Sequence, residues 1–136
     1  FLLIALLRLN HCSIKTSMQL FQLLNPMMLV RAFGNSLNGL SYALRSERAF
    51  QQEVVVLIVG SIAAFLLTDI RAERALLIGS LAIVVIIELV NSAIEAAIDR
   101  IGPELHELSK TAKDYGSAAV LVSLVLAAAI WVIILV

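Results

Sequence analysis

Three long apolar stretches dominate the chain after residue 50 and predict membrane-spanning helices. The first uninterrupted run, 54–67, has 14 residues, whereas a helix needs about 20 to cross a bilayer. We therefore expect this helix to occupy about 50–70, with polar side chains at its boundaries. The second stretch, 75–98, is long enough to span although it contains Glu88, Asn91, Ser92 and Glu95. The third, 117–136, carries no charged residue and is the clearest span.

A different periodicity precedes these spans and predicts an amphipathic helix over residues 27–48. Apolar residues recur there every three or four positions, and polar residues occupy much of the opposite face. Such a helix is typical of the membrane surface. The apolar positions are Val30, Phe33, Leu37, Leu40 and Leu44, and the polar ones are Arg31, Asn35, Asn38, Ser41 and Arg45.

Residues 1–26 form an N-terminal extension to which we assign no role. The chain starts at Phe1, and an apolar run is followed by Arg8. A signal peptide has the opposite order, with its positive charge before the apolar run. Pro26 separates this extension from the expected membrane domain, 27–136.

The composition supports a membrane protein and narrows the possible partners. The chain is 61% hydrophobic and 15% charged, whereas a soluble domain is about 45–50% apolar and about 25% charged. Ten basic and ten acidic residues give no indication of a nucleic-acid partner. The single cysteine, Cys12, excludes an intrachain disulfide and a multi-cysteine metal site.

Lysine and arginine positions predict the topology. Three spans place the N-terminal segment and the second connection on the same side of the membrane. These parts hold most of the basic residues, whereas the first connection holds Arg71 and Arg74. The positive-inside rule therefore predicts a multi-pass membrane protein with a cytoplasmic N-terminus.

The second expected span contains a stripe of polar side chains. On a helix that advances 100° per residue, these residues fall within an arc of about 100°. A charged carboxylate in hydrocarbon costs about 2.5–3.5 kcal/mol on insertion scales, so intramembrane acids usually mark a functional site. The alternative is a hydrogen-bonded stripe that only joins helices. The stripe consists of Glu88, Asn91, Ser92, Glu95 and Asp99.

Carboxylate oxygens suit Mg²⁺, which takes one or two carboxylates together with substrate phosphates. A further carboxylate would then be available as a general base. In the expected polar connection, 99–115, Lys113 would neutralise phosphate oxygens, although a charged loop beside a membrane is also ordinary surface. The chain has no Walker-type or protein-kinase-type glycine-rich loop, so an ATP site here would belong to neither of those classes.

These motifs resemble the prokaryotic integral-membrane diacylglycerol kinases. The resemblance covers about 30–136, with departures at Met28 and Asn35 near the start of the surface helix. It rests on polar residues at fixed places inside apolar helices, in the segments 39–53, 88–99, 104–108, 112–114 and 117–121.

The resemblance implies an all-α homotrimer, with three transmembrane helices and an amphipathic surface helix in each subunit. It implies ATP- and Mg²⁺-dependent phosphorylation of diacylglycerol to phosphatidic acid at the cytoplasmic face. Glu88 is expected to be the general base and to contact the substrate, and Glu47 and Glu95 the Mg²⁺ ligands. The expected nucleotide contacts are Glu47, Glu95, Glu104, His106, Lys113 and Asp114. Asn91 and Asp99 are expected to support the active site, and Ser117 is expected to contact the lipid.

Three other functions are compatible with parts of this pattern. An undecaprenol kinase would share the motif of the second span and act on a polyisoprenyl alcohol. A proton- or cation-coupled transporter subunit would also need intramembrane carboxylates, but would not depend on ATP. A purely structural subunit would lose stability, and not function, on Glu88→Gln or Glu95→Gln.

Overall fold

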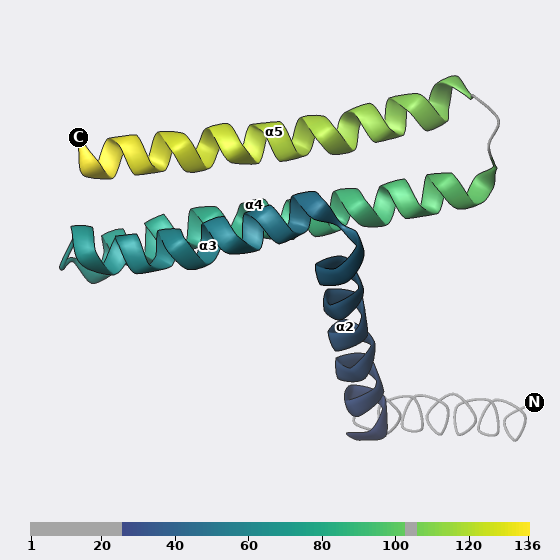
Figure 1. The fold of residues 1–136 in the computed structure, drawn as a ribbon, viewed down its shortest axis with the longest axis horizontal. Helices are drawn as coiled ribbons and strands as arrows, with labels where there is room; N and C mark the ends of the chain where they lie inside the picture. Colours follow the sequence, from purple (N-terminus) through teal and green to yellow (C-terminus); the bar gives the residue numbers. More distant parts are fainter. Residues whose placement is uncertain (1–25, 103–105) are drawn as a thin grey trace, which may run out of the picture. The chain divides into compact units, whose positions relative to one another are not determined.

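The computed structural model describes residues 26–102 and 106–136, and these form four helices without a β-strand (Figure 1). The expectation of an all-α protein is confirmed. The extension predicted at the N-terminus lies almost wholly outside the described residues. The helices are α2 (Pro26–Ser46), α3 (Arg48–Leu67), α4 (Arg71–Ile101) and α5 (Glu107–Leu135).

The chain divides into two compact units, Phe1–Leu40 and Ser41–Val136. The described part of the first unit consists of helix α2, which continues into the second unit. As the sequence predicts, α2 covers most of 27–48, and Ala43 is its only buried residue. Its apolar positions are therefore free to face a membrane or another chain.

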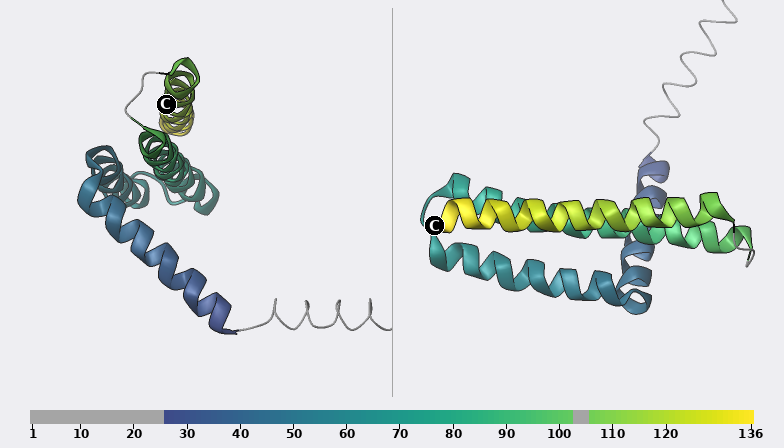
Figure 2. Two further views of the ribbon diagram at one scale, coloured as in Figure 1. Left: turned by 90° about the vertical axis from the view of Figure 1, so that its right-hand side faces the viewer. Right: turned by 90° about the horizontal axis from the view of Figure 1, so that it is seen from above.

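Helices α3, α4 and α5 belong to the second unit, where α4 packs against both of the others (Figure 2). Each of the three is long and apolar enough to cross a membrane, which confirms the predicted number of spans. Few apolar side chains are buried, among them Phe50, Leu77 and Val84, whereas most large ones remain exposed. Apolar surface of this extent requires hydrocarbon or another helix around it.

Small side chains let the three helices approach one another at mid-length. A methyl group at Gly60 of α3 would overlap the side chain of Leu81 on α4 and lie 3.4 Å from Trp131 on α5. The Trp131 indole donates a hydrogen bond to the Leu77 carbonyl at 3.3 Å. Close approach through small residues is the usual mode of helix packing in membranes.

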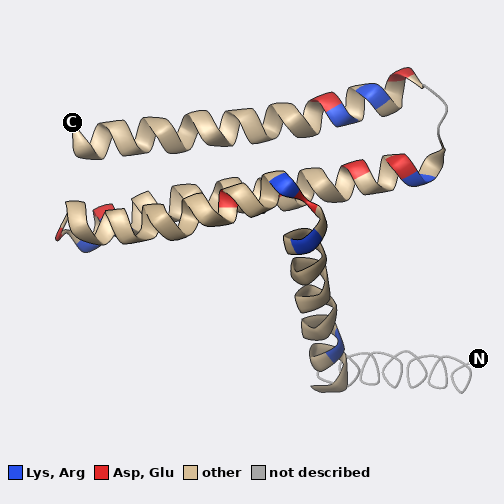
Figure 3. Cartoon of the chain, in the orientation of Figure 1, with Lys and Arg blue, Asp and Glu red and all other residues tan. Residues whose placement is uncertain are grey.

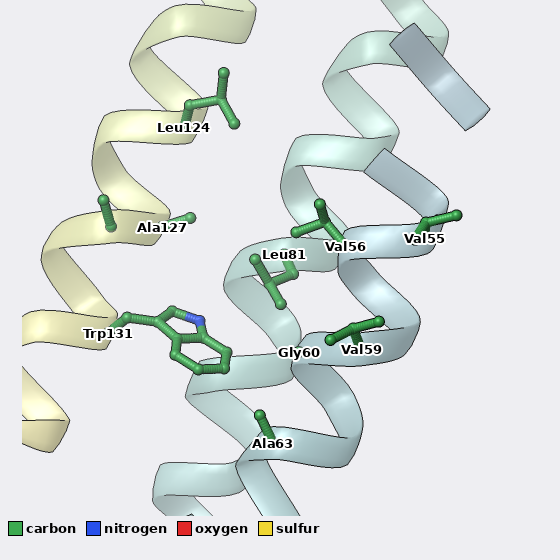
Figure 4. A pocket seen from close by; sticks show the side chains of 10 residues that line it. Val55, Val56, Val59, Gly60, Ala63, Leu81, Leu124, Ala127 and Trp131 are labelled. Atoms are coloured by element: carbon green, nitrogen blue, oxygen red, sulfur yellow. The ribbon is translucent and has the colours of Figure 1, made fainter. Parts of the chain in front are cut away.

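An apolar cavity of about 550 Å³ lies beside this contact, lined by side chains from all three helices (Figure 4). Val55 and Val59 line it from α3, Leu81 from α4, and Leu124 and Trp131 from α5. None of the predicted site residues lines this cavity.

A tight turn joins α3 to α4. The Arg74 guanidinium donates to the Thr68 carbonyl at 2.7 Å and to Asp69 at 2.9 Å, and it lies over the Phe65 ring at 4.9 Å. The Thr68 hydroxyl in turn donates to Glu73. These contacts satisfy carbonyls at the end of α3 that have no partner within that helix.

The second connection differs from the expectation. The polar segment 99–115 was predicted as a loop, but α4 continues to Ile101 and α5 begins at Glu107. Most of the segment is therefore helical, and Lys110, Lys113 and Asp114 stand on the first turns of α5. Figure 3 shows charged residues on those turns and none farther along α5. A membrane span predicted from apolar residues ends where the apolar run ends. Such a prediction therefore misses the helical turns that continue into the polar segment beyond the hydrocarbon.

Candidate functional site

The stripe of polar residues on α4 is buried at its N-terminal end and becomes exposed toward Asp99. Glu88 is 6% exposed and Asn91 8% exposed, whereas the neighbouring Val90 is 52% exposed. Glu88 and Asn91 therefore face the adjacent helices, whereas the aliphatic Val90 points outward. This arrangement keeps a carboxyl group and an amide away from lipid, as intramembrane polar groups require.

Three other carboxyl groups lie within electrostatic reach of Glu88. Those of Glu95 and Glu47 are close enough for like-charge repulsion of Glu88, and Glu53 experiences the same repulsion from Glu88. The predicted base on α4 thus lies within electrostatic reach of both predicted metal ligands, Glu95 on the same helix and Glu47 between α2 and α3. Like charges at close range favour the binding of a cation or a proton.

The position of Glu47 follows from the junction between α2 and α3. Its amide donates to the Ala43 carbonyl at 2.9 Å, and its own carbonyl accepts from the Gln51 amide at 3.1 Å. The Gln51 side chain also donates to the Leu44 carbonyl at 2.9 Å. The backbone of Glu47 is therefore held from both helices, and its side chain makes no capping hydrogen bond to α3.

Glu53 is a site residue to which the sequence analysis gave no role. Its Oε2 atom is buried and has no hydrogen-bond partner among the described residues. A buried carboxylate oxygen without a partner is costly, and in a native protein it calls for an explanation such as a catalytic role or a bound water or ion. One pattern in the sequence could have indicated that Glu53 belongs with Glu47. Glu47, Phe50 and Glu53 follow one another at intervals of three residues, as on one helical face.

Asn91 holds Glu95. The Asn91 side-chain Nδ2 donates a hydrogen bond to Glu95 Oε1 at 3.0 Å, one helical turn away. Asn91 Oδ1 is buried without a hydrogen-bond partner among the described residues. The amide therefore holds the Glu95 carboxylate by a direct hydrogen bond; its supporting role in a reaction stays a prediction.

At the connected ends of α4 and α5, Lys113 Nζ and Asp99 Oδ1 form an ion pair at 2.5 Å. The predicted supporting residue Asp99 thus orients the predicted phosphate contact Lys113. Asp114, by contrast, pairs with Lys110 at 2.6 Å on its own helix.

The other predicted contacts lie outside this group. His106 is exposed, and its Nδ1 accepts a hydrogen bond from the Leu108 amide at 3.2 Å as the N-cap of α5. Ser117 is exposed on α5. Glu104 lies outside the described residues.

The described carboxyl groups near Glu88 do not form a complete metal cage made of protein side chains alone. Among the described residues, no group of three Asp, Glu, His or Cys side chains is compact enough to hold a metal ion. Mg²⁺ characteristically takes one or two carboxylates and completes its shell with water and substrate phosphates. The binding of such an ion by Glu47 and Glu95 is part of the function proposed for this protein.

The fold and these residues define a polytopic helical membrane protein with an acidic site inside its bundle. Residues 34–135 match the family model described as prokaryotic diacylglycerol kinase. The chain belongs to this family, and it is therefore a membrane-embedded lipid kinase. The resemblance read from the sequence is confirmed, and enzyme activity is established over the transporter and structural alternatives.

Curated relatives agree with this assignment. The diacylglycerol kinase of Escherichia coli is 47% identical over 107 residues, which cover 79% of this chain and 88% of the relative. That of Pseudomonas aeruginosa is 48% identical over 107 residues, covering 79% and 87%. That of Haemophilus influenzae is 40% identical over 103 residues, covering 76% and 87%.

Proposed function

We propose that this enzyme transfers the γ-phosphoryl group of ATP to the hydroxyl of diacylglycerol, giving phosphatidic acid and ADP, with Mg²⁺ as cofactor. The observation that carries the proposal is the buried Glu88 carboxyl, within electrostatic reach of Glu47 and Glu95. The relatives named diacylglycerol kinase support this lipid as the substrate.

Glu88 is the proposed general base. It precedes Glu95 by two helical turns, or about 10 Å along the axis, and so lies deeper in the span. A lipid hydroxyl reaches the site from that depth, and Glu88 accepts its proton as the oxygen attacks phosphorus. Proton transfer to a positioned side chain contributes about 10²–10⁴-fold to a rate.

Glu47 and Glu95 are the residues that would hold Mg²⁺. The bound ion would neutralise phosphate charge and align the transferred group. Lys113, held by Asp99, neutralises further negative charge on the nucleotide. The proposed nucleotide contacts also include Glu104, His106 and Asp114, and the proposed lipid contacts include Ser117.

We also propose the cytoplasmic membrane face for this site, because ATP is supplied there. Glu95, Asp99 and Lys113 lie toward the end of the bundle where α4 connects to α5. The distribution of basic residues predicts the same side. The proposed setting is the bacterial inner membrane, with a cytoplasmic N-terminus and a membrane lipid kinase domain at 27–136.

The proposed assembly is a homotrimer, in which exposed apolar faces of the spans pack against those of other subunits. Mixing subunits that carry Glu47→Gln with subunits that carry Glu95→Gln tests whether sites are shared. Recovery of activity would establish shared sites, and no recovery would assign each site to a single chain.

The lipid substrate is tested in mixed micelles with ATP, Mg²⁺ and either diacylglycerol or undecaprenol. Label transferred to phosphatidic acid supports the proposal. Label transferred only to the polyprenol would reassign the enzyme to the undecaprenol kinases. Transfer to neither lipid by folded protein would overturn the proposed substrate and donor.

A further inference from the structure

Gly116 of α5 lies directly against the Asn91 side chain of α4. Gly116 is buried, and a methyl group added to it would overlap Asn91 Oδ1 and lie 3.2 Å from Asn91 Cγ. Its backbone is helical and has no positive φ. The glycine is therefore required by the space that the amide occupies, and not by its own backbone conformation.

This contact determines how the Asn91 amide is oriented. One end of the amide, Oδ1, lies against Gly116, and the other end, Nδ2, donates to Glu95 Oε1 at 3.0 Å. Rotating the amide by half a turn would place its oxygen against the Glu95 carboxylate, where the two acceptors repel each other. A side chain at position 116 would displace Asn91 and weaken this hydrogen bond.

We propose that Gly116 is a positioning residue of the active site, which acts through Asn91 to aim the Glu95 carboxylate at a divalent cation. The inference rests on the proposed function, because cation binding by Glu95 is part of that proposal. Residues that orient metal ligands characteristically change metal affinity by about 10–100-fold when they are replaced. Gly116 would act indirectly, because it positions Asn91 and Asn91 orients the Glu95 carboxylate.

Full-length protein in detergent micelles allows this role to be measured by titration with Mn²⁺, followed by electron paramagnetic resonance. Gly116→Ala should weaken Mn²⁺ binding by about tenfold or more. It should also raise the Mg²⁺ concentration required for half-maximal lipid phosphorylation, while KM for the lipid stays unchanged. Unchanged Mn²⁺ affinity in folded Gly116→Ala protein would overturn the proposal.

Two other glycines provide matched controls. A methyl group at Gly79 would meet nothing within 4 Å, whereas one at Gly60 would crowd Leu81 and Trp131 away from the carboxyl groups. Gly79→Ala controls for the change from glycine to alanine in a helix. Gly60→Ala controls for overpacking at a helix contact that lies away from the carboxyl groups. Neither should alter Mn²⁺ affinity; a loss in Gly60→Ala equal to that in Gly116→Ala would indicate general strain and overturn the proposal.

A double-mutant cycle tests whether Gly116 acts through Asn91. Asn91→Ala alone should weaken Mn²⁺ binding, and adding Gly116→Ala should cause no further loss, because the obstructing amide is gone. Additive losses would contradict the proposal. If Gly116→Ala alone does not fold, recovery of folding in the double variant supports the contact with Asn91, and failure to recover overturns it.

Failure of the proposed function would have a different signature. Wild-type protein that binds Mn²⁺ but phosphorylates neither lipid would overturn the proposed reaction, while the Mn²⁺ affinities of the variants would still decide the role of Gly116. Wild-type protein that binds no Mn²⁺ would overturn the positioning role together with the proposed metal site.

Discussion

Lys113 of α5 and Asp99 of α4 form a 2.5 Å ion pair between the two helices on either side of the second connection. The Lys113 side chain is 39% exposed and that of Asp99 66% exposed, so water screens the pair. Exposed pairs of this kind contribute little to stability. Under the proposed function, the pair would hold the Lys113 ammonium group in position for the nucleotide.

Asp99→Asn should therefore impair nucleotide binding more than stability. The amide retains the size of the carboxylate but no longer attracts Lys113, which becomes free to take other rotamers. We expect KM for ATP to rise several-fold while the thermal midpoint of unfolding changes little. The check is ATP saturation kinetics beside thermal unfolding in the same micelles, with Glu107→Gln as a control for removal of an exposed charge on α5. A large fall in the midpoint with unchanged KM would show that the pair is structural.

Glu95→Gln should change the dependence on metal. The side chain still accepts the hydrogen bond from Asn91 at Oε1, but it loses the charge that attracts a divalent cation. The Mg²⁺ concentration for half-maximal activity should rise about tenfold or more. Activity measured against Mg²⁺ at saturating ATP checks this, with Glu107→Gln as the control carboxylate. A metal dependence identical to wild type would remove Glu95 from the metal site.

Glu53→Gln should raise stability. The variant removes the repulsion between Glu53 and Glu88 and the charge from a buried oxygen that has no hydrogen-bond partner. We expect a higher midpoint of unfolding in micelles. Glu73→Gln is the matched control, because that carboxylate accepts a hydrogen bond from Thr68 and its replacement should not stabilise the protein. A lower midpoint for Glu53→Gln would mean that its charge is compensated in the folded protein.

Arg74→Ala should destabilise the turn between α3 and α4. It removes hydrogen bonds to the Thr68 carbonyl and to Asp69, together with the contact over the Phe65 ring. Hydrogen bonds to charged groups contribute about 1.5–3 kcal/mol, so a loss of stability of about 1–3 kcal/mol is expected. Denaturant unfolding measures it, with Arg71→Ala as the control. Equal stabilities of the two variants would contradict the role assigned to Arg74.

The sequence predicted the three spans well because their signal is local. Each apolar run can be compared directly with the thickness of a bilayer. The second connection was predicted as a loop because 99–115 is polar, but a polar segment can remain helical outside hydrocarbon. Lys110 and Asp114 pair one turn apart on that helix, and His106 caps its first turn.

The candidate site was only partly predictable, for a physical reason. Glu88, Asn91, Glu95 and Asp99 share one face of one helix, so their spacing alone groups them. The burial of Glu53 depends on how α3 packs against α4, and the contact of Gly116 with Asn91 depends on the register between α4 and α5. Packing between helices has no signature in the spacing of a single helix.

The most direct test of the central claim compares wild type with Glu88→Gln. The measurement is the initial rate of phosphate transfer from ATP to diacylglycerol in mixed micelles at saturating Mg²⁺. The variant keeps the size of the side chain and removes the proposed base, so kcat should fall by about 10²–10⁴-fold while the protein stays folded. A folded variant that retains wild-type kcat would contradict the assignment of Glu88 as the general base.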